Sequence, residues 1–207
     1  MNHPRPQPTN TPRRIYLASS WRNPNQPELV AFLRSHGHFV YDFRNPTDGD
    51  KGFAWSAIDP EWKAWNANAY RVALEHDVAV HGYDADFAGM EWADTCILLQ
   101  PCGRSAHLEA GYMAGQGKAV YARLAHGEEP ELMYRLMFEA VGALAVFDHE
   151  LLWLLDARRN FPAGANRRKL IEAKSAEIDA YARQKTVEAV ASADREVRRS
   201  RAERVWE

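Results

Sequence analysis

The repeated alternation of short apolar runs with helical segments constrains the fold of this chain most strongly. Apolar, strand-like runs occupy residues 15–19, 39–42, 95–99, 119–122 and 143–147. Between and after them lie segments of helical pattern: an amphipathic stretch that Gly37 ends, then 60–76, 84–92, 106–116, 130–140 and 149–158. Strands that alternate with helices favour a parallel sheet. We therefore predict an α/β fold with a doubly wound, five-stranded parallel sheet, flavodoxin-like or Rossmann-like, whose ligands bind beyond the carboxyl ends of the strands.

Composition divides the chain into three parts. Residues 1–12 contain four prolines, and such a segment buries too little apolar area to offset its ordering entropy, which predicts a disordered leader. Residues 13–160 are expected to form the α/β domain. Residues 161–207 are rich in Ala, Glu, Arg and Lys, which predicts a long helical extension. Its sparse apolar positions suit packing of one stripe on its own domain or on a sister subunit, and their spacing of seven gives a weak indication of a partner helix.

Charge and cysteine usage exclude several classes of protein. The 26 basic and 28 acidic residues leave a net charge of −2, which provides no field for a nucleic-acid backbone, so the expected partner is a small molecule. Cys96 and Cys102 lack metal-ligand or disulfide-framework spacing. No signal-like or membrane-spanning apolar stretch is present, and no Gly-x-Gly-x-x-Gly follows the first strand. We expect a cytoplasmic protein without metal, cofactor or membrane contact.

The segment 94–118 carries most of the chemical information. An apolar strand runs through a short polar loop into a helix, which predicts Ser105 as the N-cap and Glu109 in the first turns, on the crevice side. A carboxylate there is stabilised by the helix dipole without any catalytic role. Asp86, however, lies at a spacing that favours the same crevice, and two carboxyl groups facing one sugar suit a retaining glycosyl transfer. Asp94, directly before a buried strand, is expected to make a structural cap or turn bond.

Four blocks of the sequence resemble the nucleoside 2-deoxyribosyltransferase superfamily, which includes deoxynucleoside 5′-monophosphate N-hydrolases and CMP-type N-glycosidases. The blocks are 15–22, 51–53, 86–90 with Asp94, and 107–112 ending at 117–118, and together they span about residues 14–122. The last block, His107-Leu108-Glu109-Ala110-Gly111-Tyr112, is the most specific.

The resemblance implies roles for individual residues. Glu109 matches the nucleophilic glutamate, Asp86 the aspartate that handles the base or its proton, and Tyr16 the tyrosine that orients the glutamate. The loop around Gly52, Phe53 and Trp55 falls where the family receives the nucleobase, although these aromatic residues equally suit a core or a lid. The family also implies a homodimer or higher homo-oligomer, but the residue that a neighbouring subunit supplies is not identifiable in this sequence.

The sequence departs from the transferases at Gly103, where they carry an aspartate that binds the sugar hydroxyls. Arg104 and Ser105 follow it, and the nucleotide-cleaving members resemble this chain instead at His107 and at Arg22, which follows Ser20 and Trp21. A guanidinium and a helix N-terminus form a reasonable 5′-phosphate site, whereas most arginines are simply solvated and His107 also suits a half-buried, hydrogen-bonded histidine.

The expected function is cleavage or transfer at the N-glycosidic bond of a nucleoside or nucleoside 5′-monophosphate, through a glycosyl-enzyme on Glu109. The absence of the sugar-binding aspartate, together with Arg22, slightly favours hydrolysis of a nucleotide. Two alternatives remain open from the residues alone. One is a non-catalytic nucleotide-binding module that signals through its C-terminal helix, and the other is an NAD-cleaving glycohydrolase.

Overall fold

The computed structural model describes residues 12–125, 127–128, 131–139, 143–145, 148–156, 175–176, 178–186 and 195. The chain divides into two units, Met1–Phe161 and Pro162–Glu207. Residues 1–11 of the expected leader and most of the expected C-terminal extension lie outside the described residues. Within the second unit, residues 175–176 and 178–186 are helical, and Arg183 pairs with Asp179 one turn earlier at 2.8 Å.

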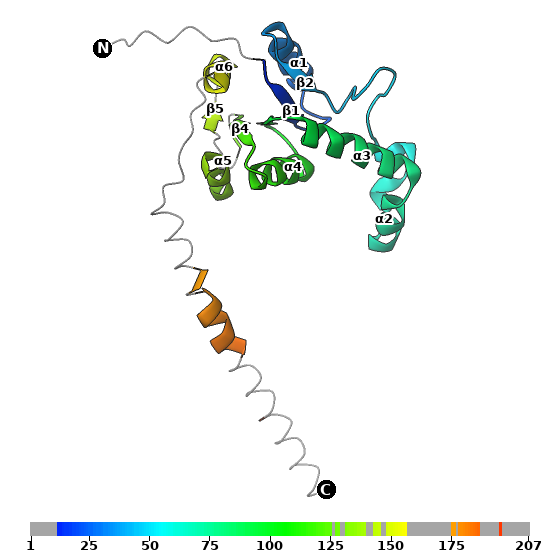
Figure 1. The fold of residues 1–207 in the computed structure, drawn as a ribbon. Coiled ribbons are helices and arrows are strands. Elements are labelled where there is room, and N and C mark those ends of the chain that lie inside the picture. Colours follow the sequence, from blue (N-terminus) through cyan, green and yellow to red (C-terminus); the bar gives the residue numbers. More distant parts are fainter. Residues whose placement is uncertain are drawn as a thin grey trace, which may run out of the picture. The chain divides into compact units, whose positions relative to one another are not determined.

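A parallel sheet forms the centre of the first unit (Figure 1). Its strand order is β2-β1-β3-β4-β5, with every neighbouring pair parallel. The strands are β1 (Arg14–Ala18), β2 (Phe39–Tyr41), β3 (Thr95–Leu99), β4 (Ala119–Arg123) and β5 (Ala143–Ala145). This is the flavodoxin-like order, in which the chain changes direction across the sheet between β1 and β3. The predicted α/β class with a parallel sheet is confirmed.

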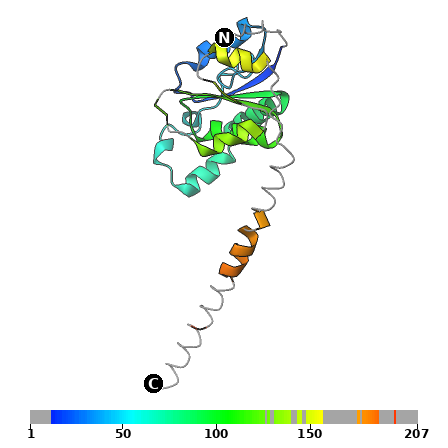
Figure 2. The ribbon, with the colours of Figure 1, turned by 90° about the vertical axis from the view of Figure 1, so that its left-hand side faces the viewer.

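Helices cover both faces of this sheet (Figures 1 and 2). One face packs against α1 (Gln26–Ser35) and α6 (Asp148–Asp156); the other packs against α3 (Asp77–Trp92), α4 (Arg104–Gly115) and α5 (Arg135–Glu139). Successive strand residues point to opposite faces, so Ile15 and Leu17 enter the first core while Tyr16 and Ala18 enter the second. Tyr16 is the residue of β1 that reaches the candidate site described below.

The ends of two helices test the sequence expectations. Gly37, at a φ of +83°, follows His36, the C-cap residue of α1, as the sequence predicts. The predicted N-cap at Ser105 is wrong. Helix α4 starts at Arg104 with Gly103 as its N-cap and no capping side chain, so Ser105 lies in the first turn. The first amide groups of α4 therefore donate no hydrogen bond to a capping side chain.

Residues 42–76 connect β2 to α3, and their structure differs from the helical pattern of the sequence. A short 3₁₀ turn, η1 (Trp55–Ala57), precedes the helix predicted over 60–76, which is instead a second 3₁₀ turn, η2 (Trp62–Ala64), followed by α2 (Ala67–Leu74). The physical reason is local capping: Asn66 accepts a hydrogen bond from the Ala69 amide, so α2 begins only after it. Helix α3 is longer than predicted because His76 caps it at Val78.

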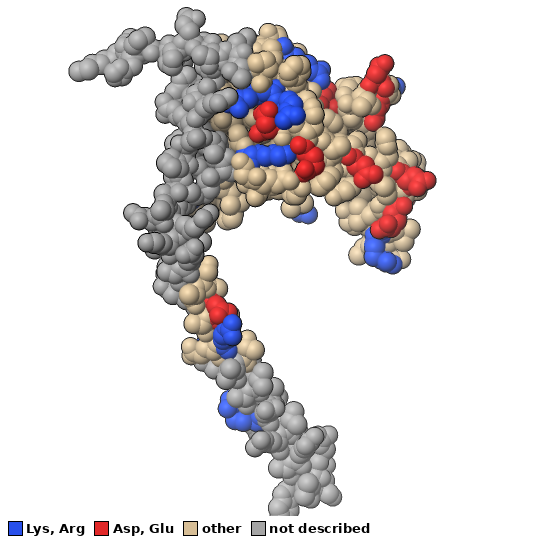
Figure 3. Space-filling view, in the orientation of Figure 1, with Lys and Arg blue, Asp and Glu red and all other residues tan. Residues whose placement is uncertain are grey.

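The described residues contain no helix long and apolar enough to cross a membrane. Figure 3 shows both acidic and basic side chains on one face of the first unit. A further short 3₁₀ turn, η3 (Leu132–Tyr134), leads directly into α5.

Candidate active site

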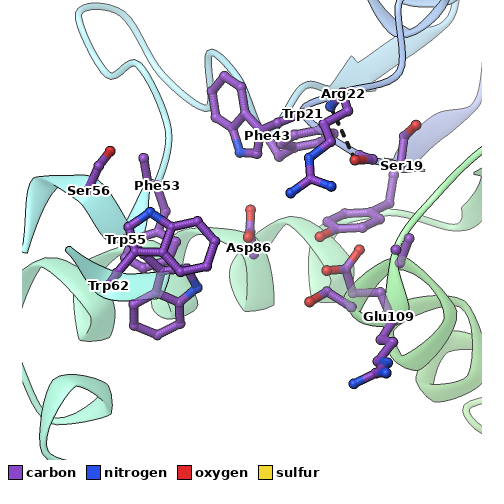
Figure 4. A pocket seen from close by; sticks show the side chains of 17 residues that line it. Ser19, Trp21, Arg22, Phe43, Phe53, Trp55, Ser56, Trp62, Asp86 and Glu109 are labelled. Atoms are coloured by element: carbon purple, nitrogen blue, oxygen red, sulfur yellow. Dashed lines mark hydrogen bonds between the residues drawn. The ribbon is translucent and has the colours of Figure 1, made fainter. Parts of the chain in front are cut away.

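A cavity of about 940 Å³ opens beyond the carboxyl ends of β1, β2 and β3, within the size range of small-molecule sites (Figure 4). Its walls come from the β1–α1 loop, from Phe43 shortly after β2, from residues 53–62, from α3 and from the start of α4. The lining residues are Tyr16, Ser19, Ser20, Trp21, Arg22, Phe43, Phe53, Ala54, Trp55, Ser56, Trp62, Asp86, Gly103, Arg104, Ser105, Ala106 and Glu109. Ten of the twelve residues singled out in the sequence line it; Gly52 and His107 do not.

Glu109 projects into the cavity from α4, one turn beyond the helix start. Burial raises its pKa to about 7, and the nearby negative charge of Asp86 contributes in the same direction. A hydrogen bond from the Tyr16 hydroxyl opposes the rise because it favours the ionised carboxylate. Tyr16 is only 1% exposed, and burial raises the pKa of its phenol well above the usual range, so it remains a donor.

Asp86 enters the same cavity from α3, opposite α4. Burial raises its pKa to about 6, the nearby Asp50 adds to the rise, and the Tyr41 hydroxyl lowers it by donating to Oδ1 at 3.0 Å. The rings of Tyr41 and Tyr16 stack with centroids 5.3 Å apart. Each of the two carboxyl groups therefore accepts a hydrogen bond from a tyrosine hydroxyl, and the rings of the two tyrosines stack on each other.

Gly89, one turn beyond Asp86 on α3, makes room for this arrangement. A Cβ atom at Gly89 would lie 2.8 Å from three atoms of the Tyr41 ring. Any side chain there would displace the ring whose hydroxyl bonds Asp86. The sequence motif around Asp86 thus includes a glycine with a packing function.

Two carboxyl groups with raised pKa values around neutrality support acid-base and nucleophilic chemistry at one site. Near pH 6–7 the pair holds one proton between its two members, so one group is available as an anion and the other as an acid. That combination is the one a retaining glycosidic reaction uses.

Arg44 holds the β1–α1 loop, and sequence reasoning missed it. Its Nη2 donates to the carbonyl oxygens of Ser20, Trp21 and Asn23 at 3.0, 2.9 and 3.0 Å. Its guanidinium also lies 5.5 Å from the centroid of the Trp21 ring. Because Arg44 follows β2 in an irregular segment, no periodicity or motif marks it, and only the fold brings it to the loop.

Two features suit an anion at one end of the cavity. The Arg22 side chain is directed into the cavity in Figure 4, and its backbone is held by the bond from its amide to Ser20 Oγ at 3.1 Å. The N-terminus of α4, residues 103–105, lines the same cavity without a capping side chain. Helix N-termini and guanidinium groups both bind phosphate.

The remaining sequence candidates lie elsewhere. His107 is half-buried beside Tyr134 of η3: its Nδ1 is 2.9 Å from the Gly103 carbonyl oxygen and its Nε2 is 3.1 Å from the Tyr134 hydroxyl. Gly52 has a φ of +71°, and a Cβ there would collide with the Phe43 carbonyl oxygen, so it shapes the loop. It lines a separate small cavity of about 50 Å³ beside Phe53 and Asp86.

Asp94 makes the structural contacts expected of it. Its carboxylate accepts from the Arg14 amide at 3.2 Å and from the Thr95 hydroxyl at 2.8 Å. Among the residues that the structure describes, no group of three or more His, Cys, Asp and Glu side chains is arranged to hold a metal ion.

Aromatic rings form much of the cavity wall, in two groups. Trp21 and Phe43 pack edge to face with centroids 5.5 Å apart. Phe53 and Trp55 do the same at 4.6 Å, and Trp65 and Tyr70 contact the Trp55 ring from behind at 5.5 Å each. Trp62, on η2, lies beside the second group in Figure 4.

Comparisons with known proteins add little to this picture. No family model matches the sequence, and no curated protein matches it. The structure is similar to that of the CMP N-glycosidase BcmB from Clostridium botulinum, with 16% sequence identity and a TM-score of 0.41, covering 70% of this chain and 98% of that one. Similarity at this level leaves the chemistry to be deduced from the residues of the site.

Proposed function

We propose that this protein cleaves the N-glycosidic bond of a nucleoside 5′-monophosphate, with Glu109 as the nucleophile and Asp86 as the acid. The observation that carries the proposal is the pair of carboxyl groups in one cavity, each bonded by a tyrosine hydroxyl and each with a pKa raised towards neutrality. A pure binding site for a phosphate ester would be weakened by two buried carboxylates.

The reaction proceeds in two displacements. The first displacement starts from the minor form of the pair, with Glu109 ionised and the shared proton on Asp86, because the pKa of about 7 for Glu109 exceeds that of about 6 for Asp86 in the free site. A Glu109 carboxylate oxygen attacks C1′, the bond from C1′ to the base nitrogen breaks, and its electron pair goes to the base, which takes the proton from Asp86. In the second, ionised Asp86 takes a proton from water, the water oxygen bonds to C1′, and the ester bond to Glu109 breaks. A free base in place of water would make the same site a transferase.

The roles of the supporting residues follow from their contacts. Tyr16 orients Glu109 through its hydrogen bond and offsets part of the charge that returns to the carboxylate when the ester breaks. Arg22, Arg104 and Ser105 form the phosphate end, with Ser20 and Trp21 on the same loop as Arg22. Gly103 supplies no acceptor for the sugar hydroxyls, which favours water as the acceptor over transfer between nucleosides.

The decisive experiment is chromatography of base released from nucleosides, 5′-monophosphates and NAD, with and without a free acceptor base. We expect release from monophosphates by the wild type, and a loss of at least about a thousandfold in Glu109→Gln. Glu61→Gln is the matched carboxylate control, because Glu61 is exposed and lines neither cavity. Full turnover in Glu109→Gln would contradict the mechanism; cleavage of NAD in place of monophosphates would reassign the substrate.

Phosphate recognition is tested separately. Arg22→Ala should raise KM for a 5′-monophosphate far more than for the matching nucleoside. Equal losses on both substrates would remove the phosphate site from the proposal. A homodimer or higher homo-oligomer stays a prediction, and light scattering of the purified chain measures it directly.

A further inference from the structure

We propose that the base released at this site carries a bulky, flat, apolar substituent, and that Trp55 and Trp62 receive it. This inference rests on the proposed function, because it places the sugar carbon C1′ at Glu109 and the base beyond it. It names the substrate class: nucleoside 5′-monophosphates with an aromatic or similarly large group on the base.

The size of the cavity is the first argument. Small-molecule sites range from roughly 300 to 1,000 Å³, and this cavity of about 940 Å³ stands near the upper limit. An unmodified nucleoside monophosphate is a compact ligand for which the lower part of that range suffices. The rest of the cavity is filled either by a larger ligand or by water.

The second argument is the direction in which the extra room extends. The polar residues that suit sugar and phosphate lie near Glu109: Arg22 and Glu109 share one side of the cavity in Figure 4, with Asp86 between them and the tryptophans. Trp55 and Trp62 line the opposite side, beyond Asp86. A substrate with C1′ at Glu109 and its leaving nitrogen towards Asp86 therefore points the far edge of its base at these two rings.

The third argument is the chemistry of that far wall. The two aromatic groups are separate within the described part of the chain, since no ring contact joins Trp21 and Phe43 to Phe53, Trp55 and Trp62. One group suffices to stack on one base. The second group offers a face to a second flat moiety, and Trp55 is braced for this by Phe53, Trp65 and Tyr70.

Bracing of this kind has a consequence for binding. Trp65 is itself held, because its Nε1 donates to Asp59 at 2.6 Å. A ring fixed before the ligand arrives loses little conformational entropy on binding, so contact with it contributes to affinity. Ser56, which follows Trp55 on η1, also lines the cavity and is exposed.

The test compares base release from AMP with N6-benzyl-AMP, and from CMP with N4-benzoyl-CMP. We expect kcat/KM to favour the substituted member of at least one pair by about tenfold or more, through a lower KM. Trp62→Ala should bring that ratio towards one. So should Ser56→Trp, which fills the same space without removing a ring. Trp92→Ala is the control for loss of a tryptophan, because Trp92 lies at the end of α3 outside the lining.

Equal or better turnover of the plain nucleotides, with a ratio unaffected by Trp62→Ala and Ser56→Trp, would overturn the inference and leave the proposed function standing. If no nucleotide loses its base, the proposed function fails, and the inference is then decided by calorimetric titration of the wild type. Binding of N6-benzyl-AMP at least about tenfold tighter than AMP supports the aromatic subsite; equal binding refutes it.

Discussion

Replacing Glu109 with Gln should stabilise the folded protein at alkaline pH and leave its stability almost unchanged at acidic pH. The carboxyl group has an ordinary pKa of 4.5 and a pKa of about 7 in the fold. Because the folded value is the higher one, the native state binds more protons than the unfolded state between these pH values. Stability therefore falls as the pH rises from about 4.5 to about 7, and the full cost is present above about 7.

The magnitude follows from the difference of about 2.5 in pKa. One pKa unit is worth about 1.4 kcal/mol, so ionised Glu109 costs the fold at most about 3 kcal/mol at pH 8. Gln has nearly the same shape, carries no charge and still accepts the bond from Tyr16. The variant should gain about 2–3 kcal/mol at pH 8, which corresponds to roughly 5–10 °C in Tm for a domain of this size.

The assay is urea unfolding of the full chain at about pH 5 and pH 8, followed by circular dichroism. An unchanged slope with a higher midpoint at pH 8 alone is the expected pattern. Glu61→Gln, at an exposed glutamate before η2, is the matched control and should show no such difference. No gain at pH 8, or the same gain at both pH values, would show that burial does not penalise the Glu109 charge and would refute the reasoning.

Three further predictions concern the contacts around the two carboxyl groups. The pH profile of kcat/KM should be bell-shaped with its maximum near pH 6–7, set by the carboxyl pair; a flat profile from pH 5 to 8 would contradict it. Tyr41→Phe removes a bond that lowers the pKa of Asp86, so the break of the profile near pH 6 should move to higher pH, whereas an unmoved break argues against a role for Asp86. Arg44→Lys keeps the charge but loses the three-carbonyl clamp, and should raise KM for monophosphates about tenfold or more with a smaller change in kcat; unaltered KM would show that the loop holds itself.

Local sequence features predicted the parts of this structure that depend on neighbouring residues. The apolar run 95–99 became β3 with the predicted bounds, because a run buried on both faces can only be a central strand. Gly37 ended α1, since its positive φ is a local requirement. Sequence patterning also marked Glu109, because a carboxylate just inside a helix after a buried strand points to the strand ends. Asp86 was marked by its spacing before the same strand and by the family resemblance.

Local pattern was misleading where side chains far apart in the sequence, or hydrogen bonds between side chain and backbone, decide the outcome. The helix expected over 60–76 is instead one 3₁₀ turn, η2, and the helix α2, because the side chains of Asp59 and Asn66 accept hydrogen bonds from backbone amides. Ser105 did not cap α4, since the helix begins one residue before it. His107, a substrate-binding candidate that equally suited a half-buried, hydrogen-bonded histidine, lies outside the cavity lining and is bonded to Gly103 and Tyr134.

The sequence by itself determined the α/β class, the parallel sheet and which carboxyl groups lie at the strand ends, because these follow from periodicity and from the directions of side chains along strands and helices. Only the tertiary structure decided their electrostatics. Burial among α3, α4 and the strands raises the pKa values of Asp86 and Glu109, and Tyr41 and Tyr16 reach them from two different strands. It also brought Arg44 to the β1–α1 loop and Trp62 to the far wall, since such contacts depend on how distant segments pack and leave no periodic trace in the chain.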